Sequence, residues 1–534
     1  MQRRDLLTAG AALLAAPTLS SLVLAQPAYA QSVAARTLRV IPQANLTSLD
    51  PIWTTAVVTR NHAFLIYDQL CAQDASGAIK PQMAEGWAEE DDGRSLVFTL
   101  REGLRFHDGE RVTAADCVAS ISRWARRDPF AQVLWPRVDD LAVLDDRRFR
   151  FRLKRPTPLL LAALGQTQFP CFIMPARIAA TDPFQQIRDA VGSGPFRFLP
   201  GEWNPGQTAV WAKFDGYVPR TEPVDGLAGG RVPKIERVEW TIISDSATAA
   251  NAMTTGEQDY WEYPLHDLLP LMRRNRQLVV EQRLLDATYG ICRFNTLHPP
   301  FNNPAIRRAV AMAMDQRDYL RAVAGNEADG WGVCEGVFTC GTPLANEAGG
   351  EVLKTHSLER AKAALAAAGY NGEKVVLVAP SDYPQINALS LVTADILRRL
   401  GMNLELVSTD WGSLVQRRAS KEPVDKGGWS VIHTTSSGQS LTVPATHLFL
   451  RANGANAWFG WPDAPEIERL RTAWIDAADA AEARRIAEAL NREAMQLMAY
   501  VPLGYYWQPS VWRRNVTGVF RCPVTALWNI GKSA

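Results

Sequence analysis

Apolar and polar positions between residues 84 and 125 follow two periods, that of a strand and then that of a helix. Apolar residues recur at alternate positions along Ser95–Leu100, which predicts a strand. Two short segments with Gly after Glu or Asp follow and predict turns. Thr113 then occupies an N-cap position, with Asp116 three residues later, before an apolar-striped helix. We therefore expect strand, turns and helix in close succession.

A second pattern, in the C-terminal half, predicts a β-α-β unit. Its strands are expected at Val375–Val378 and Leu404–Val407, with a helix over Leu389–Leu400 between them. Another helix is expected from Ser357, a capping serine, to Gly369, a stop signal. Such units build α/β lobes, so the fold class is α/β.

The N-terminal segment 1–30 has the pattern of an export signal. Arg3–Arg4 supplies the charged region, Leu6–Leu24 is apolar, and Ala28–Ala30 gives a cleavage site. The paired arginines are similar to a twin-arginine signal, but the flanking positions depart from that pattern, so Sec and Tat export both stay open. We expect a mature protein that is soluble in the periplasm.

Composition and charge narrow the class of protein. The chain has 534 residues, enough for two or three domains, with 47% hydrophobic and 21% charged residues. Lys and Arg number 57 against 56 Asp and Glu, and no basic block stands out, so nucleic acid is excluded as a partner. The 17 tryptophans suit a cleft that grips ligands by stacking.

Cysteines and histidines offer no catalytic or metal-binding pattern. Cys334 and Cys340, two of seven cysteines, bracket a Gly-containing loop and either close a local disulfide or remain thiols. The other five cysteines are isolated, and the seven histidines are scattered without metal-ligand or triad spacing. We expect a protein that is not an enzyme and that holds no cofactor and no metal.

Ordered motifs along the chain resemble the extracytoplasmic solute-binding proteins of peptide and nickel ABC importers, solute-binding family 5. The resemblance covers about 37–520. It rests on the string 84–121, on Leu49–Asp50–Pro51, on Gly192–Phe198, on Cys292–Asp315 and on Ser357–Tyr370. The resemblance implies a two-lobed periplasmic binding protein fold (type II, cluster C), with an extra domain inserted in lobe one.

The same resemblance suggests the domain boundaries. Lobe one comprises 31–61, 191–287 and 505–534, the insert 62–190, and lobe two 288–504. The two crossings between the lobes are expected near Asp286–Cys292 and Val501–Tyr506.

Membership of this family implies a periplasmic component of an ABC importer. It captures a small or medium solute by lobe closure and delivers it to an inner-membrane permease with its ATPase. We expect a monomer. Two alternatives stay open: a binding protein that feeds a signalling receptor, and a sugar, opine or nickel-type ligand in place of a peptide.

The family's peptide binders hold the ligand along a strand that follows a Gly-Trp pair, here Gly428–Trp429. A carboxylate three residues beyond the Trp takes the peptide's ammonium in those relatives, but here that position is Ile432. Burying an unpaired charge is costly, so we expect an amine-blocked or polyhydroxylated ligand. The polar segment 433–440 supplies neutral hydrogen bonds to such a ligand, or is a polar turn.

The resemblance also assigns further ligand-binding residues. Arg418 matches an arginine that meets ligand carboxylates, although Arg417 could serve equally, or the arginine could be a surface residue. The remaining expected contacts are Thr55, Val57, Trp261, Tyr289, Trp411, Ser430, His433 and Thr434. Trp261 and Tyr289 are expected contacts because they lie just past predicted strands near the hinge, and core packing is the alternative for them.

Overall fold

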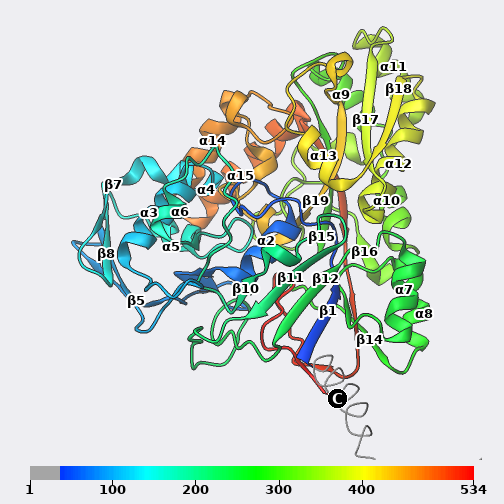
Figure 1. Cartoon of the computed structure of the whole chain (residues 1–534). Helices are drawn as coiled ribbons and strands as arrows, with labels where there is room; N and C mark the ends of the chain where they lie inside the picture. Colours follow the sequence, from blue (N-terminus) through cyan, green and yellow to red (C-terminus); the bar gives the residue numbers. More distant parts are fainter. Residues whose placement is uncertain (1–35, 327, 534) are drawn as a thin grey trace, which may run out of the picture.

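The computed structural model describes residues 36–326 and 328–533, and the expected export signal lies outside these ranges. Figure 1 shows three parts: two α/β lobes and, beside them, a group of strands and helices from residues 84–180. Within the described ranges, no helix combines the length and the apolar character that crossing a bilayer requires. The two-lobed α/β architecture agrees with the fold class that the sequence predicts.

Lobe one is built on a seven-stranded mixed sheet in which β1 pairs parallel to both β12 and β13. In order across the sheet the strands are β10 (Phe196–Phe198), β11 (Thr208–Lys213), β12 (Arg237–Thr241), β1 (Thr37–Ile41), β13 (Tyr260–Trp261), β21 (Ser510–Arg513) and β14 (Leu278–Glu281). Its helices include α2 (Val57–Ile66), α7 (Ser246–Thr255) and α8 (Leu269–Arg274).

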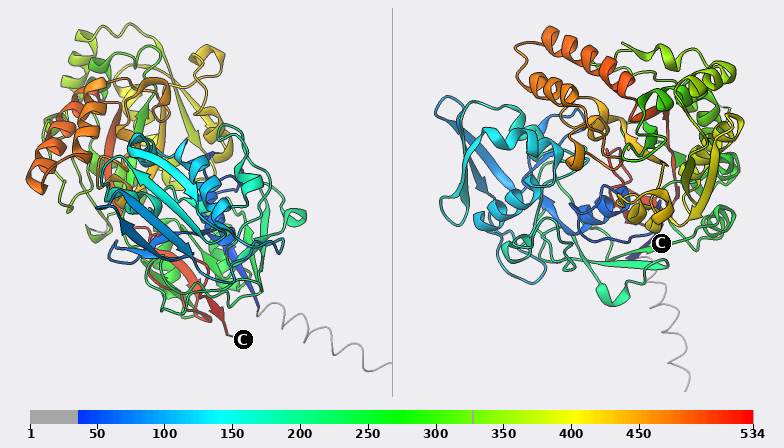
Figure 2. Two further views of the ribbon diagram at one scale, coloured as in Figure 1. Left: turned by 90° about the vertical axis from the view of Figure 1, so that its left-hand side faces the viewer. Right: turned by 90° about the horizontal axis from the view of Figure 1, so that it is seen from above.

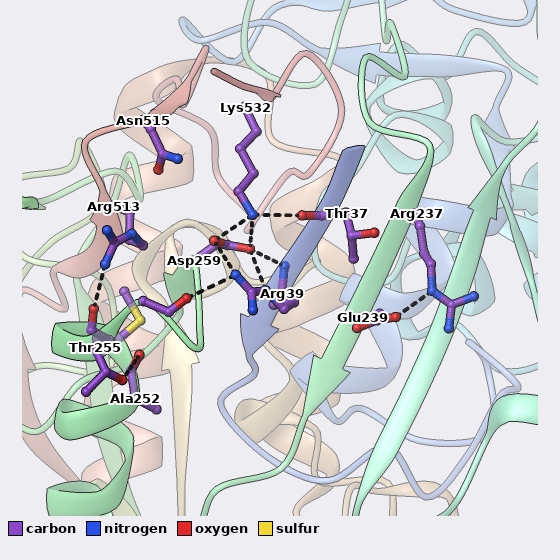
Figure 3. A network of polar contacts seen from close by, with 12 residues as sticks. Thr37, Arg39, Arg237, Glu239, Ala252, Thr255, Asp259, Arg513, Asn515 and Lys532 are labelled. Atoms are coloured by element: carbon purple, nitrogen blue, oxygen red, sulfur yellow. Dashed lines mark hydrogen bonds and ion pairs between the residues drawn. The ribbon is translucent and has the colours of Figure 1, made fainter. Parts of the chain in front are cut away.

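A buried ion cluster joins three distant segments of lobe one (Figure 3). The carboxylate of Asp259 lies 3.1 Å from Nε of Arg39 in β1 and 2.9 Å from Nζ of Lys532 near the C-terminus. A buried carboxylate is tolerated when charged donors surround it. The cluster therefore holds β1, the residue before β13 and the segment around Lys532 together in lobe one.

Lobe two contains a six-stranded sheet, with helices α10 (Gln316–Ala324) and α12 (Pro384–Arg399) packed against it. In order the strands are β16 (Trp331–Gly332), β20 (Tyr500–Tyr506), β15 (Thr288–Phe294), β19 (Val431–Ser437), β17 (Lys374–Pro380) and β18 (Asn403–Thr409). Because β17 and β18 are parallel and α12 connects them, the expected β-α-β unit is confirmed. The other helices here include α9 (Pro304–Ala311), α11 (Leu358–Ala367), α13 (Trp411–Arg417), α14 (Pro465–Ile475) and α15 (Ala480–Leu497).

The chain crosses between the lobes through two short segments, 282–287 and 507–509. The first overlaps the expected position. The second follows the expected segment, because Tyr500–Tyr506 is almost wholly buried and pairs with β15 inside the sheet of lobe two. Lobe two also contains the disulfide between Cys334 and Cys340, and the other five cysteines are free and buried.

The group beside the lobes has its own antiparallel sheet (Figure 2). Its strands and helices also enclose a separate hydrophobic core. The strands, in order, are β5 (Ala84–Glu90), β6 (Ser95–Leu100), β8 (Arg148–Leu153) and β7 (Val138–Val143), and the helices are α3 (Ala114–Ala125), α4 (Pro129–Leu134), α5 (Leu159–Leu164) and α6 (Ala176–Ala179). The predicted cap of α3 is confirmed, because the backbone N–H of Thr113 donates to the Asp116 carboxylate at 2.8 Å. We call this group the insert.

A buried ion pair connects the insert to lobe one. Nη2 of Arg123 in α3 donates to Oδ2 of Asp50 at 2.8 Å, and both side chains are shielded from solvent. Asp50 also accepts from the backbone N–H groups of Ile52 and Ile187. These contacts fix the segment 50–55 at the junction of the insert and lobe one.

Candidate ligand-binding cavity

A cavity of about 270 Å³ lies where the insert, lobe one and lobe two meet. Lobe one contributes the segment 51–55, the insert contributes residues from 124–129 and 169–170, and Phe184 follows the insert in the chain. Lobe two closes the cavity with residues from the loop 448–461. A pocket between lobes that close on a hinge is the usual place for a small ligand in such a fold.

Arg418, at the C-terminal end of α13, carries a buried charge without an acidic partner among the residues that the structure describes. Its side chain is 2% exposed, and Nη2 donates to the hydroxyls of Thr54 and Thr55 at 3.3 Å each. Its Nε has no hydrogen-bond partner, and burial lowers the guanidinium pKa to about 9. An unmatched buried cation is unfavourable, so the position suits a ligand anion.

Aromatic rings surround this guanidinium. The centre of the Arg418 guanidinium lies 4.8 Å from the ring centroid of Phe459 and 5.5 Å from that of Trp458. Cation–π contacts of this kind stabilise a charge while leaving its N–H donors available. Because Phe459 and Trp458 also line the cavity, Arg418 lies directly behind the cavity wall.

A second arginine supports the aromatic loop. Arg293 in β15 donates from Nε to the carbonyl of Phe459 at 2.7 Å, and from its Nη atoms to the carbonyls of Phe449 and Trp458. Each nitrogen of its guanidinium thus donates to a backbone carbonyl. Its role is to hold the loop 449–459 in place.

The insert contributes a buried carboxyl group, that of Asp128. Oδ1 accepts from the backbone N–H of Ala131 at 2.7 Å and caps α4, whereas Oδ2 has no hydrogen-bond partner. Full burial raises the pKa of this carboxyl to about 7. Near neutral pH the group is therefore divided between its charged and neutral forms.

Four of the expected ligand-binding residues form one group, of which Thr55 lines the cavity and the other three lie behind its wall. Arg418 contacts Thr55. The Trp411 ring packs beside Arg418 at 5.9 Å, and Nε1 of Trp429 donates to the Arg418 carbonyl at 3.1 Å. Both tryptophans are buried, so they support Arg418 from inside lobe two.

Two further residues expected to bind the ligand, Val57 and Gly428, lie near this group and shape the backbone there. Val57, half-buried, is the first residue of α2 and follows the cavity segment. The backbone of Gly428 lies against that of Glu422, so closely that a Cβ at position 428 would be 1.8 Å from the Glu422 carbonyl oxygen. Its own carbonyl accepts from Nη2 of Arg417 at 2.8 Å, so Arg417 is occupied by backbone.

The strand after Trp429 lies deeper than expected. Ser430 bonds to Val376 through both backbone and hydroxyl, and Ile432 is 1% exposed. The imidazole of His433 lies between the hydroxyls of Ser390 and Thr393 in α12, and burial lowers its pKa to about 3. β19 is an inner strand of its sheet, which encloses these side chains.

The placement of β19 bears directly on the expected contacts. Thr434, also in β19, is buried too. None of Ser430, Ile432, His433 and Thr434 lines the cavity, which differs from the expected cleft wall. Their role as ligand contacts stays a prediction that this arrangement does not favour.

Tyr289 and Trp261 lie away from the cavity. The Tyr289 hydroxyl accepts from the backbone N–H of Cys340 at 3.1 Å, and its ring packs against Tyr505. Trp261 belongs to a small hydrophobic core in lobe one together with Met253 and Leu278. These positions agree with the core-packing alternative for both residues.

Several cavity residues were missed by the sequence reasoning. They include Asp128, Arg451, Trp458, Phe459 and Trp461. The run Trp458–Phe459–Gly460–Trp461 could have indicated an aromatic wall, because it concentrates large rings around a glycine in a loop. Asp128 and Arg451 carry no such signal, since only the packing of the insert on lobe two brings them together.

The described residues form no recognisable metal-binding site. No group of three or more His, Cys, Asp or Glu side chains is placed to hold a metal ion in 36–326 and 328–533. The donors around the cavity are mainly guanidinium groups and indoles, which are not metal ligands.

The two-lobed fold with a cavity where its parts meet is that of a binding protein. The model for bacterial extracellular solute-binding proteins, family 5 (middle region), matches residues 78–456. A relative from Sinorhizobium fredii, named as a probable peptide ABC transporter periplasmic-binding protein, is 37% identical over 538 residues and is covered fully, as is this chain. The chain belongs to solute-binding family 5.

More distant relatives have the same fold. The glutathione-binding protein GsiB of Salmonella typhi is 24% identical, with 96% of each chain covered. The binding protein AgaA of A. tumefaciens R10, solved with agropinic acid, superposes with a TM-score of 0.76 at 22% identity, covering 93% of this chain and 99% of AgaA. A dipeptide-binding protein from Pseudoalteromonas sp. SM9913, solved with Met-Leu, gives 0.74 at 19% identity, covering 93% and 100%. These relatives are binding proteins rather than enzymes.

Proposed function

We propose that this protein captures a small, carboxylate-bearing solute between its lobes, holds the carboxylate on Arg418, and delivers the solute to the permease of an ABC importer. The single observation that carries the proposal is the buried guanidinium of Arg418, which has no acidic partner and an unused Nε donor. A bound carboxylate would supply both the missing charge and the missing acceptor.

The position of Arg418 supports capture by lobe closure. Its donors reach hydroxyls of lobe one, while its backbone belongs to lobe two. A solute anion at this point would contact both lobes at once. Binding energy would therefore favour the closed arrangement over the open one.

The chemistry of position 432 limits how a peptide could bind. Ile432 pairs with Arg293 across the sheet, and no acid stands at this position to take an α-ammonium. The relative from Sinorhizobium fredii is named as a peptide binder, and every free peptide ends in a carboxylate. We therefore favour a peptide-like acid whose amino end is blocked, or is held elsewhere than at 432.

The cellular role follows from the family. Export by the segment 1–30, function as a monomer in the periplasm, and association with a permease and its ATPase complete the proposal. Uptake and sensing use the same lobes, and the family favours uptake.

Native mass spectrometry of the protein, recovered from the periplasm with its solute, tests this function. We expect a mass excess that disappears on denaturation, and a released compound with at least one carboxylic acid. A released compound without an acidic group would overturn the proposal. The variant Arg418→Gln should emerge without the compound, whereas Arg417→Gln, the matched control, should retain it.

A further inference from the structure

Arginines surround the cavity and lack acidic partners. Arg126, Arg127 and Arg451 line it, and Arg418 lies behind its aromatic wall. Within the described part of the chain, none of the four forms an ion pair with Asp or Glu. The cavity therefore carries an excess of positive charge.

Several buried arginines elsewhere in the described part of the chain have their charge or their donors compensated. Arg231 pairs with Asp68, Arg123 with Asp50 and Arg471 with Glu468, at 2.7–2.9 Å. Arg293 and Arg307 instead direct their donors to backbone carbonyls. Compensation of buried guanidinium groups is thus common in this fold but not universal: Arg60 in α2, outside the cavity, bonds only to the side-chain oxygens of Gln168 and Asn61 and also has an unpartnered Nε. What distinguishes the cavity is that two such arginines, Arg418 and Arg451, border one enclosed space.

Arg451 marks a second point where an anion would fit. Its side chain is 6% exposed, and Nη2 donates to the amide oxygen of Gln132 in α4 at 2.8 Å. Its Nε is buried without a partner, and burial lowers the guanidinium pKa to about 10. A purely structural tie to α4 would explain the contact to Gln132 but would leave this donor unused.

Asp128 is the single acid among the residues that line the cavity. It attracts Arg451 without forming an ion pair and offsets only part of the positive charge, because one carboxyl group, partly neutral near pH 7, faces several guanidinium groups. At the opening, Arg127 stacks over Phe184 at 5.1 Å and over Trp53 at 5.7 Å, and it adds to a positive field that attracts anions.

We propose that the solute carries two anionic groups, one held by Arg418 and a second, a carboxylate or a phosphate, held by Arg451. The inference rests on the proposed function and deepens it, since a single carboxylate would leave one of the two buried guanidinium groups without a counter-charge. It also explains why two unused Nε donors, on different segments of lobe two, border one cavity.

Calorimetry with pairs of probes that differ by one anionic group tests the inference. The pairs are glutathione with its glycine monoethyl ester, N-acetylglutamate with N-acetylglutamine, and N-acetyl-O-phosphoserine with N-acetylserine. In at least one pair we expect the dianion to bind ten times more tightly or better. A gain only in the third pair would identify the second group as a phosphate, and a gain in the first two as a carboxylate.

The variants attribute this gain to Arg451. Arg451→Gln should bring the dianion to the affinity of its monoanionic partner, and Arg451→Lys should retain part of the gain. Arg155→Gln removes an exposed positive charge outside the cavity and should leave the dianion's gain in affinity unchanged. Circular dichroism melting of each variant shows that it is folded.

Three results would overturn the inference: equal affinity within every pair, a gain that survives in Arg451→Gln, or no binding of any dianion at millimolar concentration. If monoanions bind well and Arg418→Gln abolishes their binding, the dianionic solute is excluded while the proposed function stands. If bound probes are indifferent to Arg418→Gln, both proposals fail.

Discussion

Nη2 of Arg418 in lobe two lies 3.3 Å from Oγ1 of Thr55 in lobe one, within a structure that encloses a cavity. The same hydroxyl accepts from Nε1 of Trp458 at 3.4 Å. A threonine hydroxyl orients the guanidinium but cannot neutralise it. Thr55 therefore presents Arg418 to the cavity and leaves its charge for the solute.

Replacing Thr55 by valine should weaken solute binding by about three- to tenfold, which corresponds to the loss of about one hydrogen bond. The loss should not add to that of Arg418→Gln, because both changes act on one contact. Calorimetry on the two single variants and the double variant measures this coupling. Thr255→Val, in α7 and far from the cavity, is the matched control. Simple additivity would contradict the orienting role of Thr55.

The charge of Arg418 should cost stability when no solute is bound. Arg418→Gln removes an uncompensated buried cation, so the empty variant should melt at the same temperature as the wild type or higher. Arg417→Gln loses its contacts to the Gly428 carbonyl and should melt slightly lower. Scanning calorimetry in solute-free buffer compares the two. A marked destabilisation by Arg418→Gln would mean that the arginine is structural.

Asp128 should make stability depend on pH. Its carboxyl pKa is about 7 in the folded protein and about 3.9 in the unfolded chain, so between these values the folded state holds a proton that the unfolded state lacks. Through this group, the free energy of unfolding falls as pH rises from 4 to 7, by about 1.4 kcal/mol per pH unit. Asp128→Asn removes this dependence and should gain stability relative to the wild type as pH rises.

Denaturant melts of wild type and Asp128→Asn at pH 4.5, 6 and 7.5 measure the difference. Asparagine still caps a helix, so the variant should fold. Asp245→Asn, which alters the exposed cap of α7, should show no such trend. Parallel pH curves for Asp128→Asn and the wild type would contradict a raised pKa.

Gln439 should favour the closed arrangement. Its Nε2 donates to Oε1 of Gln73, and its Oε1 accepts from the hydroxyl of Thr167 at 2.7 Å, which joins lobe two to the segment that precedes the insert and to the insert itself. Gln439→Ala loses both bonds, so the empty protein should open more often and bind its solute more weakly. Small-angle X-ray scattering should show a larger radius of gyration. Gln207→Ala removes only a local hydrogen bond to Asn204 and should leave the radius of gyration unchanged. If Gln439→Ala has the same radius of gyration as Gln207→Ala, Gln439 does not hold the closed arrangement.

A free α-ammonium should gain nothing at position 432. The dipeptide Met-Leu and its N-acetyl form are expected to bind with similar affinity, or the acetylated form more tightly, because Ile432 offers no acceptor. Calorimetry on the pair decides. Tight binding of Met-Leu that acetylation abolishes would contradict this reading, and loss of that binding in Asp128→Asn would locate the substitute acid.

The fold could be predicted because local patterns and their order agree. The alternation of Ser95–Leu100, the cap at Thr113 and the β-α-β unit around α12 all appear where their sequences indicate. The return crossing was placed too early, because hydrophobic periodicity does not reveal which sheet a buried strand joins. Tyr500–Tyr506 reads equally well in either lobe.

The site was predictable only in part. Arg418 and Thr55 lie in segments that carry a family pattern, and the structure brings them into contact. The role of His433 as a ligand contact stays a prediction that the structure does not favour, because its imidazole turns toward α12, and a strand's two faces cannot be told apart from the sequence when polar residues occupy both. Asp128 and Arg451 depend on tertiary contacts between the insert and lobe two, which leave no local trace.

A crystal structure of the protein with its retained solute tests the central claim most directly. We predict a solute carboxylate in the cavity, with an oxygen within hydrogen-bond distance of the guanidinium of Arg418 and with Nε among its donors. A solute bound elsewhere, or one that turns an uncharged group toward Arg418, would contradict the account.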